Sequence, residues 1–246
     1  MLFDNELQIG QIIRRPNRFI IDVEIEGRQV ACHCPTTGRI GNLVLDGLPC
    51  MLSPSDNPKR KTRYTVEAIS VDPPATATDN LRWVGINQNA ANRYVEAALT
   101  ADLVPEMITA GAVRREQTLG ASRLDFLVDD DTYIEVKTPL QDLQIDVGPH
   151  IQTRKAAPFD STDRFVKHFT ELGASLGIHQ RALLAVCFLY DNPGFVVHPS
   201  VRHDAVAAQV AVAVEQGVEI WQINFELDRS GVKVLRCVSL TDRFVG

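Results

Sequence analysis

The sequence predicts an α+β protein, in which a small N-terminal β-barrel precedes a mixed sheet flanked by helices in the α/β manner. Residues 8–72 hold several short β-prone runs separated by Gly and Pro turns, without a convincing helix pattern. From residue 85 onwards, helix and strand patterns alternate, which is typical of a sheet covered by helices. Residues 71–79 lack apolar periodicity and form the expected linker. We therefore expect two domains, at 1–80 and 81–246.

Composition indicates a globular protein of the cytoplasm. The 246 residues are 45% hydrophobic and 23% charged, with a net charge of −6, so any contact with nucleic acid needs a local basic patch. The five cysteines are odd in number and without framework spacing, and the first residues resemble no signal peptide, which favours a reducing compartment. No apolar run approaches the roughly 20 residues that span a bilayer.

The first eighty residues predict strands at 19–25, 29–34, 43–45 and 63–71. Glu26-Gly-Arg, Thr37-Gly-Arg and Asp46-Gly supply tight turns between them. Their spacing and the length of the segment fit a five-stranded barrel of the oligonucleotide-binding (OB) type.

Two basic clusters in this segment are candidate nucleic-acid contacts, because cations beside Phe19 and Tyr64 suit a surface that binds phosphates and stacks bases. A solvated loop is the alternative for either cluster. The candidate residues are Arg14, Arg15, Arg18, Lys59, Arg60, Lys61 and Arg63.

Cysteine spacing gives little support to a zinc site. Cys32 and Cys34 would share one face of a strand, with His33 on the other, and structural zinc sites prefer two residues between paired cysteines. We expect buried, unreactive thiols.

A helix is expected after Asn87 and Asn89, which are suitable capping residues, with an apolar stripe that includes Tyr94, Val95, Ala98 and Leu99. Asn92 and Glu96 lie one turn apart on a different face. Glu96 is a solvated helix residue or a candidate third carboxylate for the acidic hairpin that follows.

That hairpin is the central feature of the second domain. Two β-prone runs flank Asp129-Asp-Asp131, so a turn centred on Asp130 would set Asp125 opposite Glu135. Alternation then puts Asp125, Glu135 and Lys137 on one face, and the apolar Leu124, Phe126, Ile134 and Val136 on the other. Facing carboxylates repel each other unless a cation lies between them, which predicts a divalent metal ion with Lys137 beside it. A solvated sheet face is the alternative.

The remaining elements complete a mixed sheet. Residues 139–157 form an irregular segment that suits a lid or substrate loop. A helix capped by Asp160 or Ser161 follows, and residues 183–190 are a continuous apolar run, as in a strand buried on both faces. Another helix between Asp204 and Gly217 precedes two further strands. On the helix that follows Asp160 or Ser161, the buried stripe consists of Phe165, Phe169 and Leu172. Its other side carries Arg164, Lys167 and His168, which face either the carboxylates or solvent.

A helix glutamate followed by Asp125 and Glu135-Val-Lys137 resembles the PD-(D/E)xK nuclease fold. Over nearly the whole chain, in register, the sequence resembles the sugar fermentation stimulation protein A (SfsA) family. The segments that carry this resemblance are Arg14-Arg-Pro-Asn-Arg-Phe19, His33-Cys-Pro-Thr-Thr-Gly-Arg39, Ser53-Pro-Ser-Asp-Asn-Pro-Lys-Arg-Lys-Thr-Arg63, Asn92-Arg-Tyr-Val-Glu96, Ser122-Arg-Leu-Asp-Phe126 and Glu135-Val-Lys137. The resemblance implies an OB-like barrel, a nuclease-like domain, DNA binding of low sequence specificity and a regulatory link to sugar metabolism.

The resulting hypothesis is a metal-dependent nuclease that uses Mg²⁺ or Mn²⁺. Asp125, Glu135 and Lys137 would be catalytic, and Glu96, Asp125 and Glu135 would be the metal ligands. A non-catalytic DNA-binding regulator on the same scaffold is the alternative. A sugar-responsive enzyme or sensor is disfavoured because the sequence has no Gly-rich phosphate loop. The expected partner is nucleic acid, DNA before RNA, and a homodimer is the candidate assembly.

Overall fold

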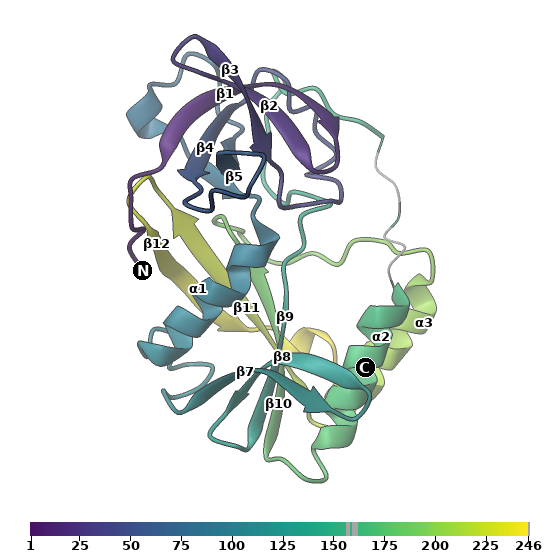
Figure 1. Ribbon diagram of the computed structural model, residues 1–246. Coiled ribbons are helices and arrows are strands. Elements are labelled where there is room, and N and C mark those ends of the chain that lie inside the picture. The colour runs from purple at the N-terminus through teal and green to yellow at the C-terminus, as the bar shows by residue number, and fades with distance from the viewer. Residues whose placement is uncertain (156–157, 159–161, 246) are drawn as a thin grey trace.

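A computed structural model describes residues 1–155, 158 and 162–245 and shows a barrel above a sheet covered by helices (Figure 1). Five strands close the barrel in the order β3-β2-β1-β4-β5, because His33 of β3 pairs with Thr65 of β5. This confirms the predicted OB-like barrel. The strands are β1 (Gln8–Asn17), β2 (Ile20–Ile25), β3 (Arg28–His33), β4 (Pro49–Pro54) and β5 (Tyr64–Ser70).

The strand predicted at 43–45 is wrong, and β4 takes its place in the barrel. Leu43 forms only a single bridge, to Thr153 of the second domain, and Val44 N–H donates to the Gln152 carbonyl over 2.9 Å. Leu43 and Leu45 are buried. These residues are therefore apolar because a distant segment covers them, not because they belong to a barrel strand.

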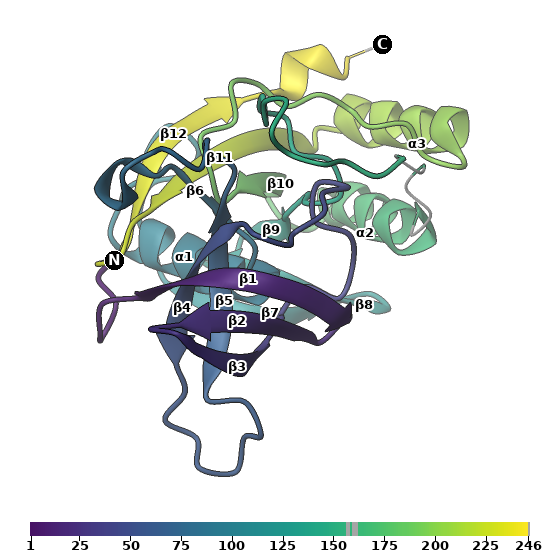
Figure 2. The same cartoon turned by 90° about the horizontal axis from the view of Figure 1, so that it is seen from above.

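The second sheet is mixed, as predicted, with the order β12-β11-β10-β9-β8-β7. The neighbours β9, β10 and β11 are parallel, and the pairs at either edge are antiparallel. Helix α1 (Gln88–Thr100) covers one face, and α2 (Thr162–Ser175) and α3 (His203–Glu215) cover the other (Figures 1 and 2). The strands are β7 (Val113–Leu119), β8 (Ser122–Val128), β9 (Thr132–Lys137), β10 (Arg181–Phe188), β11 (Glu219–Leu227) and β12 (Val232–Ser239).

Burial on both faces explains the apolar run in β10. Leu183, Ala185 and Cys187 pack in the cluster beneath α1, whereas Leu184, Val186 and Phe188 pack in the cluster with α2 and α3. Helix α2 follows the irregular segment as expected, although its predicted caps, Asp160 and Ser161, lie outside the described residues.

The β8–β9 hairpin has the predicted register. Val128 pairs with Thr132 and Phe126 with Ile134, and Asp129 and Asp130 occupy the left-handed region with φ of 50° and 62°. Aspartate tolerates that conformation better than most residues. The predicted face of Phe126, Ile134 and Val136 packs beneath α1. The prediction for Leu124 is wrong, because the ladder to β9 ends at Phe126 and Leu124 packs in the opposite cluster, which includes Leu127 and Tyr133.

The two domains are connected at several places. Short β6 (Trp83–Gly85) pairs with β5, and Gly85 N–H donates to the Leu189 carbonyl over 2.7 Å. Buried Glu67 of β5 accepts hydrogen bonds from Ser53 Oγ (2.6 Å) and Asn87 Nδ2 (2.7 Å). Asn87 thus uses its side chain to hold the barrel, and within the described chain it makes no capping bond to α1. The N-terminus reaches the other domain too, since Met1 N donates to the Val232 carbonyl over 2.7 Å.

The cysteines are free thiols, four of them buried and Cys237 half-buried. Cys32 is fully buried, as predicted. Burial, with the Asp22 charge as a smaller cause, raises the pKa of Cys32 to about 11 and so favours the protonated thiol. In the described part of the chain no helix is long and apolar enough to cross a membrane.

Candidate functional site

Asp125 lies where β8 separates from β9. The ladder that ends at Phe126 leaves the Val136 N–H without a strand partner, and this N–H donates to Asp125 Oδ2 over 2.8 Å. From α1, Asn92 Nδ2 donates to Asp125 Oδ1 over 2.6 Å. Both oxygens are therefore oriented by neutral donors, and the carboxylate fills the gap between the strands.

Glu135 forms a buried cluster with two basic side chains. Its Oε1 contacts both Lys137 Nζ and His168 Nδ1, and those two nitrogens are 3.4 Å apart. The Glu135 side chain is only 3% exposed, whereas that of Lys137 is 28% exposed. Lys137 is therefore the charged group of this cluster that a substrate can reach.

His168 completes the cluster from α2, a position that the sequence left open between the carboxylates and solvent. It is buried and reaches Glu135 across the sheet face, whereas its neighbour Lys167 is exposed and donates to the Ala121 carbonyl over 2.8 Å. The helical periodicity of α2 separated these two residues from its apolar stripe, but only the fold distinguishes them from each other.

The two carboxylates are close enough for one charge to act on the other. Burial is the larger cause and the charge of Glu135 the second in raising the pKa of Asp125 above its ordinary value of 3.8. Hydrogen bonds from Val136 and Asn92 and the charge of Lys137 offset only part of this rise. Asp125 and Glu135 thus repel each other in a partly desolvated site. The predicted placement of both on one face of the hairpin is wrong, because the ladder does not pair them and Asp125 contacts Asn92 of α1 whereas Glu135 contacts His168 of α2.

This coupling makes stability depend on pH. In the unfolded chain Asp125 titrates near pH 3.8, and in the folded protein its raised pKa keeps the proton bound to higher pH. The resulting stabilisation is complete below pH 3.8 and is lost as the pH rises through the raised pKa. We therefore expect the unfolding free energy of the wild type to fall, relative to that of Asp125→Asn, as the pH rises above about 4.

Urea unfolding of both proteins in EDTA, at several pH values, measures this difference. The variant has no titrating group at the position, so the pH dependence of the difference follows Asp125 and its repulsion of Glu135. A difference that does not change with pH would contradict a raised pKa at Asp125.

Glu96, the third predicted metal ligand, lies elsewhere on α1. Its Oε2 is 3.3 Å from Arg115 Nη1 on β7, and it is Asn92, one turn earlier, that contacts Asp125. Over residues 1–155, 158 and 162–245, no group of three or more His, Cys, Asp or Glu side chains is placed to hold a metal ion. The structure therefore brings together Asp125, Glu135 and Lys137, but not Glu96.

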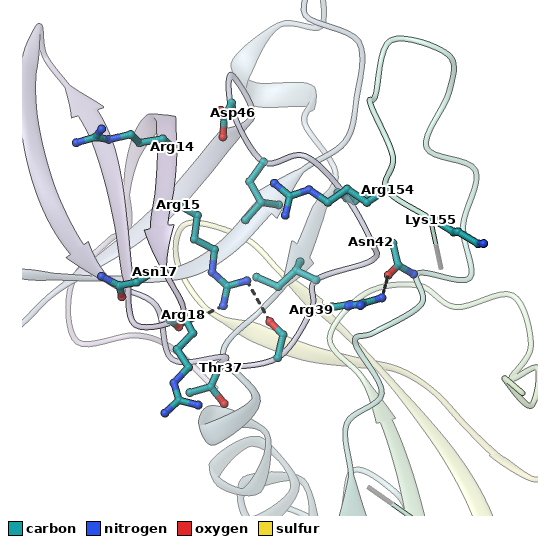
Figure 3. Close-up of a pocket in the computed structure, with 14 residues that line it drawn as sticks. Arg14, Arg15, Asn17, Arg18, Thr37, Arg39, Asn42, Asp46, Arg154 and Lys155 are labelled. Atoms are coloured by element: carbon teal, nitrogen blue, oxygen red, sulfur yellow. Dashed lines mark hydrogen bonds between the residues drawn. The ribbon is translucent and has the colours of Figure 1, made fainter. Parts of the chain in front are cut away.

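The first predicted basic cluster lines a pocket of about 560 Å³ at the side of the barrel (Figure 3). Arg14 is paired with Asp22 over 2.8 Å, and Arg18 lies over the exposed Phe19 ring at 4.7 Å. Arg15 has a structural role, because it donates to the carbonyls of Arg18, Thr36 and Gly38 and so connects two loops. Arg14 bonds Asp22 through Nε, so it can meet a ligand only with its other nitrogens, whereas Arg18 presents its guanidinium above the Phe19 ring.

The pocket contains three further cations, Arg39, Arg154 and Lys155, that sequence reasoning missed. Arg39 ends the segment 33–39, which resembles the SfsA family, but no neighbouring residue indicated that it would contact a ligand. Arg154 and Lys155 lie more than eighty residues beyond the last barrel strand in sequence and reach the barrel only through the fold.

The second predicted basic cluster lies on the loop between β4 and β5, which projects from the barrel as an arm (Figure 2). Lys59, Lys61 and Arg63 are exposed there, and Arg60 donates to Thr62 Oγ1 and Thr65 Oγ1 over 3.3 and 3.1 Å. None of these four described residues lines the pocket, so the two clusters form separate basic surfaces.

Both domains match known families. Residues 13–86 match the family described as "SfsA N-terminal OB domain", and residues 89–231 match "Sugar fermentation stimulation protein RE domain". Among relatives named "Sugar fermentation stimulation protein homolog", that of Alcanivorax borkumensis is 33% identical over 231 residues, covering 89% of this chain and 91% of the relative. That of Teredinibacter turnerae is 34% identical over 242 residues, covering 95% and 97%.

A solved structure has the same fold. "The structure of Pyrococcus Furiosus SfsA in complex with Ca2+" aligns with a TM-score of 0.71 at 23% sequence identity. The alignment covers 97% of this chain and 96% of that chain, so it includes both the barrel and the mixed sheet.

Proposed function

The chain belongs to the sugar fermentation stimulation protein A family, and from this membership and the site geometry we propose that it binds DNA with low sequence specificity and cleaves it with the help of a divalent metal ion. The observation that carries the proposal is the pair of coupled, partly desolvated carboxylates, Asp125 and Glu135, beside the accessible ammonium group of Lys137. Charged groups held in such a setting are characteristic of functional sites.

The carboxylates fit a hard cation such as Mg²⁺ or Mn²⁺, which prefers oxygen ligands. Glu135 Oε2 is buried and has no hydrogen-bond partner among the described residues, so it is an acceptor that a cation would satisfy. A cation would also relieve the repulsion between Asp125 and Glu135. Glu96 would join them by leaving its ion pair with Arg115. The description of the Pyrococcus furiosus protein in complex with Ca²⁺ supports this choice of ligand.

A bound Mg²⁺ or Mn²⁺ supplies positive charge against the negative charge that a phosphodiester develops during hydrolysis. The protein's own residues set the geometry. Asp125 keeps one orientation because Asn92 and the Val136 N–H hold its two oxygens. Lys137 carries three N–H donors, of which one contacts Glu135 and a second can face His168 Nδ1 at 3.4 Å, so at least one remains for a phosphate oxygen or the attacking water.

Low sequence specificity follows from the kind of contacts available. The exposed groups of both basic surfaces are arginine and lysine side chains, which bind phosphates, and phosphate contacts carry no base information.

A non-catalytic DNA-binding regulator is the second candidate. The ion pair between Glu96 and Arg115 favours it, because that pair leaves the described carboxylates short of a three-residue metal site.

Incubation of the purified protein with labelled single- and double-stranded DNA and RNA, in Mg²⁺, Mn²⁺ or EDTA, tests the proposal. We expect metal-dependent cleavage that EDTA abolishes and that the Asp125→Ala variant lacks. Asp242→Ala removes an exposed carboxylate outside the site and is the matched control, for which wild-type cleavage is expected. Salt-sensitive binding without cleavage under every metal condition would support the regulator instead.

A further inference from the structure

We propose that the basic pocket beside the barrel binds one nucleotide of a single-stranded nucleic acid, and that the second domain completes this site with Arg154 and Lys155. The inference rests on the proposed nucleic-acid binding but not on cleavage. It names the substrate class that the barrel prefers.

Both domains build the pocket. Arg14 and Arg18 come from β1 and its turn into β2, and Arg39 from the long connection between β3 and β4. Arg154 and Lys155 come from the segment that leaves strand β9 after Lys137. In Figure 3 the Arg154 side chain extends from this segment towards the side of the pocket where Arg15 lies.

The pocket is fixed before a ligand arrives. Arg154 N–H donates to the Asn42 carbonyl over 2.6 Å, and Asn42 Nδ2 donates to the Gln141 carbonyl over 3.1 Å. The bridge between Leu43 and Thr153 lies beside them. Because the protein itself orders these loops, a ligand loses little of its binding energy in ordering them.

The charge of the pocket calls for an anion. The lining includes six cationic side chains, among which Arg15 is occupied by backbone carbonyls and Arg14 is paired with Asp22. Asp46 is the acidic residue among the described lining residues. The whole chain carries a net charge of −6, so this concentration of cations runs against its overall composition. Phosphate groups are the ligand that arginine forks bind best.

The shape of the pocket favours a single strand over a duplex. Its volume of about 560 Å³ falls in the range of sites that enclose a small molecule, and the lining includes the apolar Ile40, Leu43 and Leu45 beneath the arginines. A nucleotide splayed from a flexible strand can place its base against this apolar surface and its phosphate on the rim. A duplex keeps its bases stacked inside and presents its phosphates on a convex surface.

An aromatic platform stands next to the rim. Phe19 is 46% exposed and is stacked by Arg18, whose guanidinium lies 4.7 Å from the ring centroid. Exposed aromatic side chains beside a basic groove are the usual stacking sites for successive bases of a single strand.

Fluorescence anisotropy in EDTA tests this assignment without any cleavage. The probes are a labelled single-stranded oligonucleotide of about ten nucleotides and a duplex of the same length. Arg154→Glu reverses one exposed charge of the pocket, and Arg28→Glu makes the same change at the start of β3, outside the pocket. We expect Arg154→Glu to weaken single-strand binding about tenfold and to lower the salt slope by about one, with a change under about twofold for Arg28→Glu.

Each other result has a definite meaning. If Arg154→Glu and Arg28→Glu weaken single-strand binding equally, the pocket is not the binding site and the protein attracts the strand by its diffuse charge alone. If Arg154→Glu weakens duplex and single-strand binding equally, the preference for a single strand is wrong. If a free nucleoside monophosphate displaces the strand at matched nucleotide concentration, the pocket binds a small ligand instead. If the wild type binds neither probe, the proposed nucleic-acid function itself fails. Unchanged unfolding midpoints in urea show that both variants are folded.

Discussion

Replacing Lys137 by methionine is expected to lower the rate of phosphodiester cleavage at least about a hundredfold while leaving nucleic-acid binding nearly unchanged. Methionine keeps much of the length and apolar volume of the lysine stem but removes the ammonium group that contacts Glu135. A pre-oriented donor aimed at developing charge contributes more to the transition state than to the bound ground state. The effect should therefore appear in the rate and not in affinity.

Single-turnover cleavage with excess protein, beside anisotropy in EDTA, separates the two quantities. Lys167→Met is the matched control, because it removes the same charge from a nearby exposed residue that donates only to the Ala121 carbonyl. We expect its cleavage rate to stay within about twofold of wild type. A Lys137→Met protein that cleaves at the wild-type rate, or that loses rate and binding in parallel, would show that Lys137 has no separate part in the chemistry.

Local sequence patterns were sufficient for the central hairpin. Three aspartates between two β-prone runs set a turn at Asp129 and Asp130, and a turn of known position determines which residues pair. The register at Phe126 and Ile134 follows from that alone. Where the strands separate, at Asp125, the alternation rule no longer applies, and this is why the prediction for Leu124 is wrong and why Asp125 contacts the Val136 backbone.

Long-range contacts set the limit of prediction elsewhere. Asn92 and Glu96 share a helix face, and only the position of Arg115 on β7 decides that Glu96 turns away while Asn92 meets Asp125. Leu43 is apolar, like a residue of a barrel strand, but it is buried because the segment around Thr153, far along the chain, packs on it. For the same reason the pocket cations Arg154 and Lys155 carried no local signal. These features are tertiary, and a single sequence holds no pattern that marks them.

His168 is the feature of the site on which the metal proposal depends most directly, although α2 is remote from the hairpin in sequence. His168 and Lys137 both contact Glu135 Oε1, which leaves Oε2 as the oxygen without a partner among the described residues. His168 thus orients the carboxylate so that one defined oxygen is available to a cation. It is a positioning residue, since its observed contacts are with Glu135 and Lys137.

We expect His168→Leu to raise the Mn²⁺ concentration that half-saturates cleavage by about ten- to a hundredfold, because residues that orient a metal ligand have effects of that size. His168→Asn, which keeps a polar group near the position of Nδ1, should recover much of the loss. DNA binding in EDTA should stay unchanged in both variants, because neither basic surface includes α2. Thr170→Ala, an exposed change on the same helix, is the control.

The metal dependence distinguishes positioning from a general loss of packing. Removing one partner from buried Glu135 is also expected to lower the unfolding free energy by up to about 3 kcal/mol, and a loss of folded protein lowers the amplitude of cleavage at every Mn²⁺ concentration alike. A half-saturating Mn²⁺ concentration that rises in His168→Leu and returns towards the wild-type value in His168→Asn arises only if His168 sets the orientation of the Glu135 carboxylate. If the half-saturation point is the same in wild type and His168→Leu, His168 serves the core of the domain and the orientation of Glu135 depends on Lys137 alone.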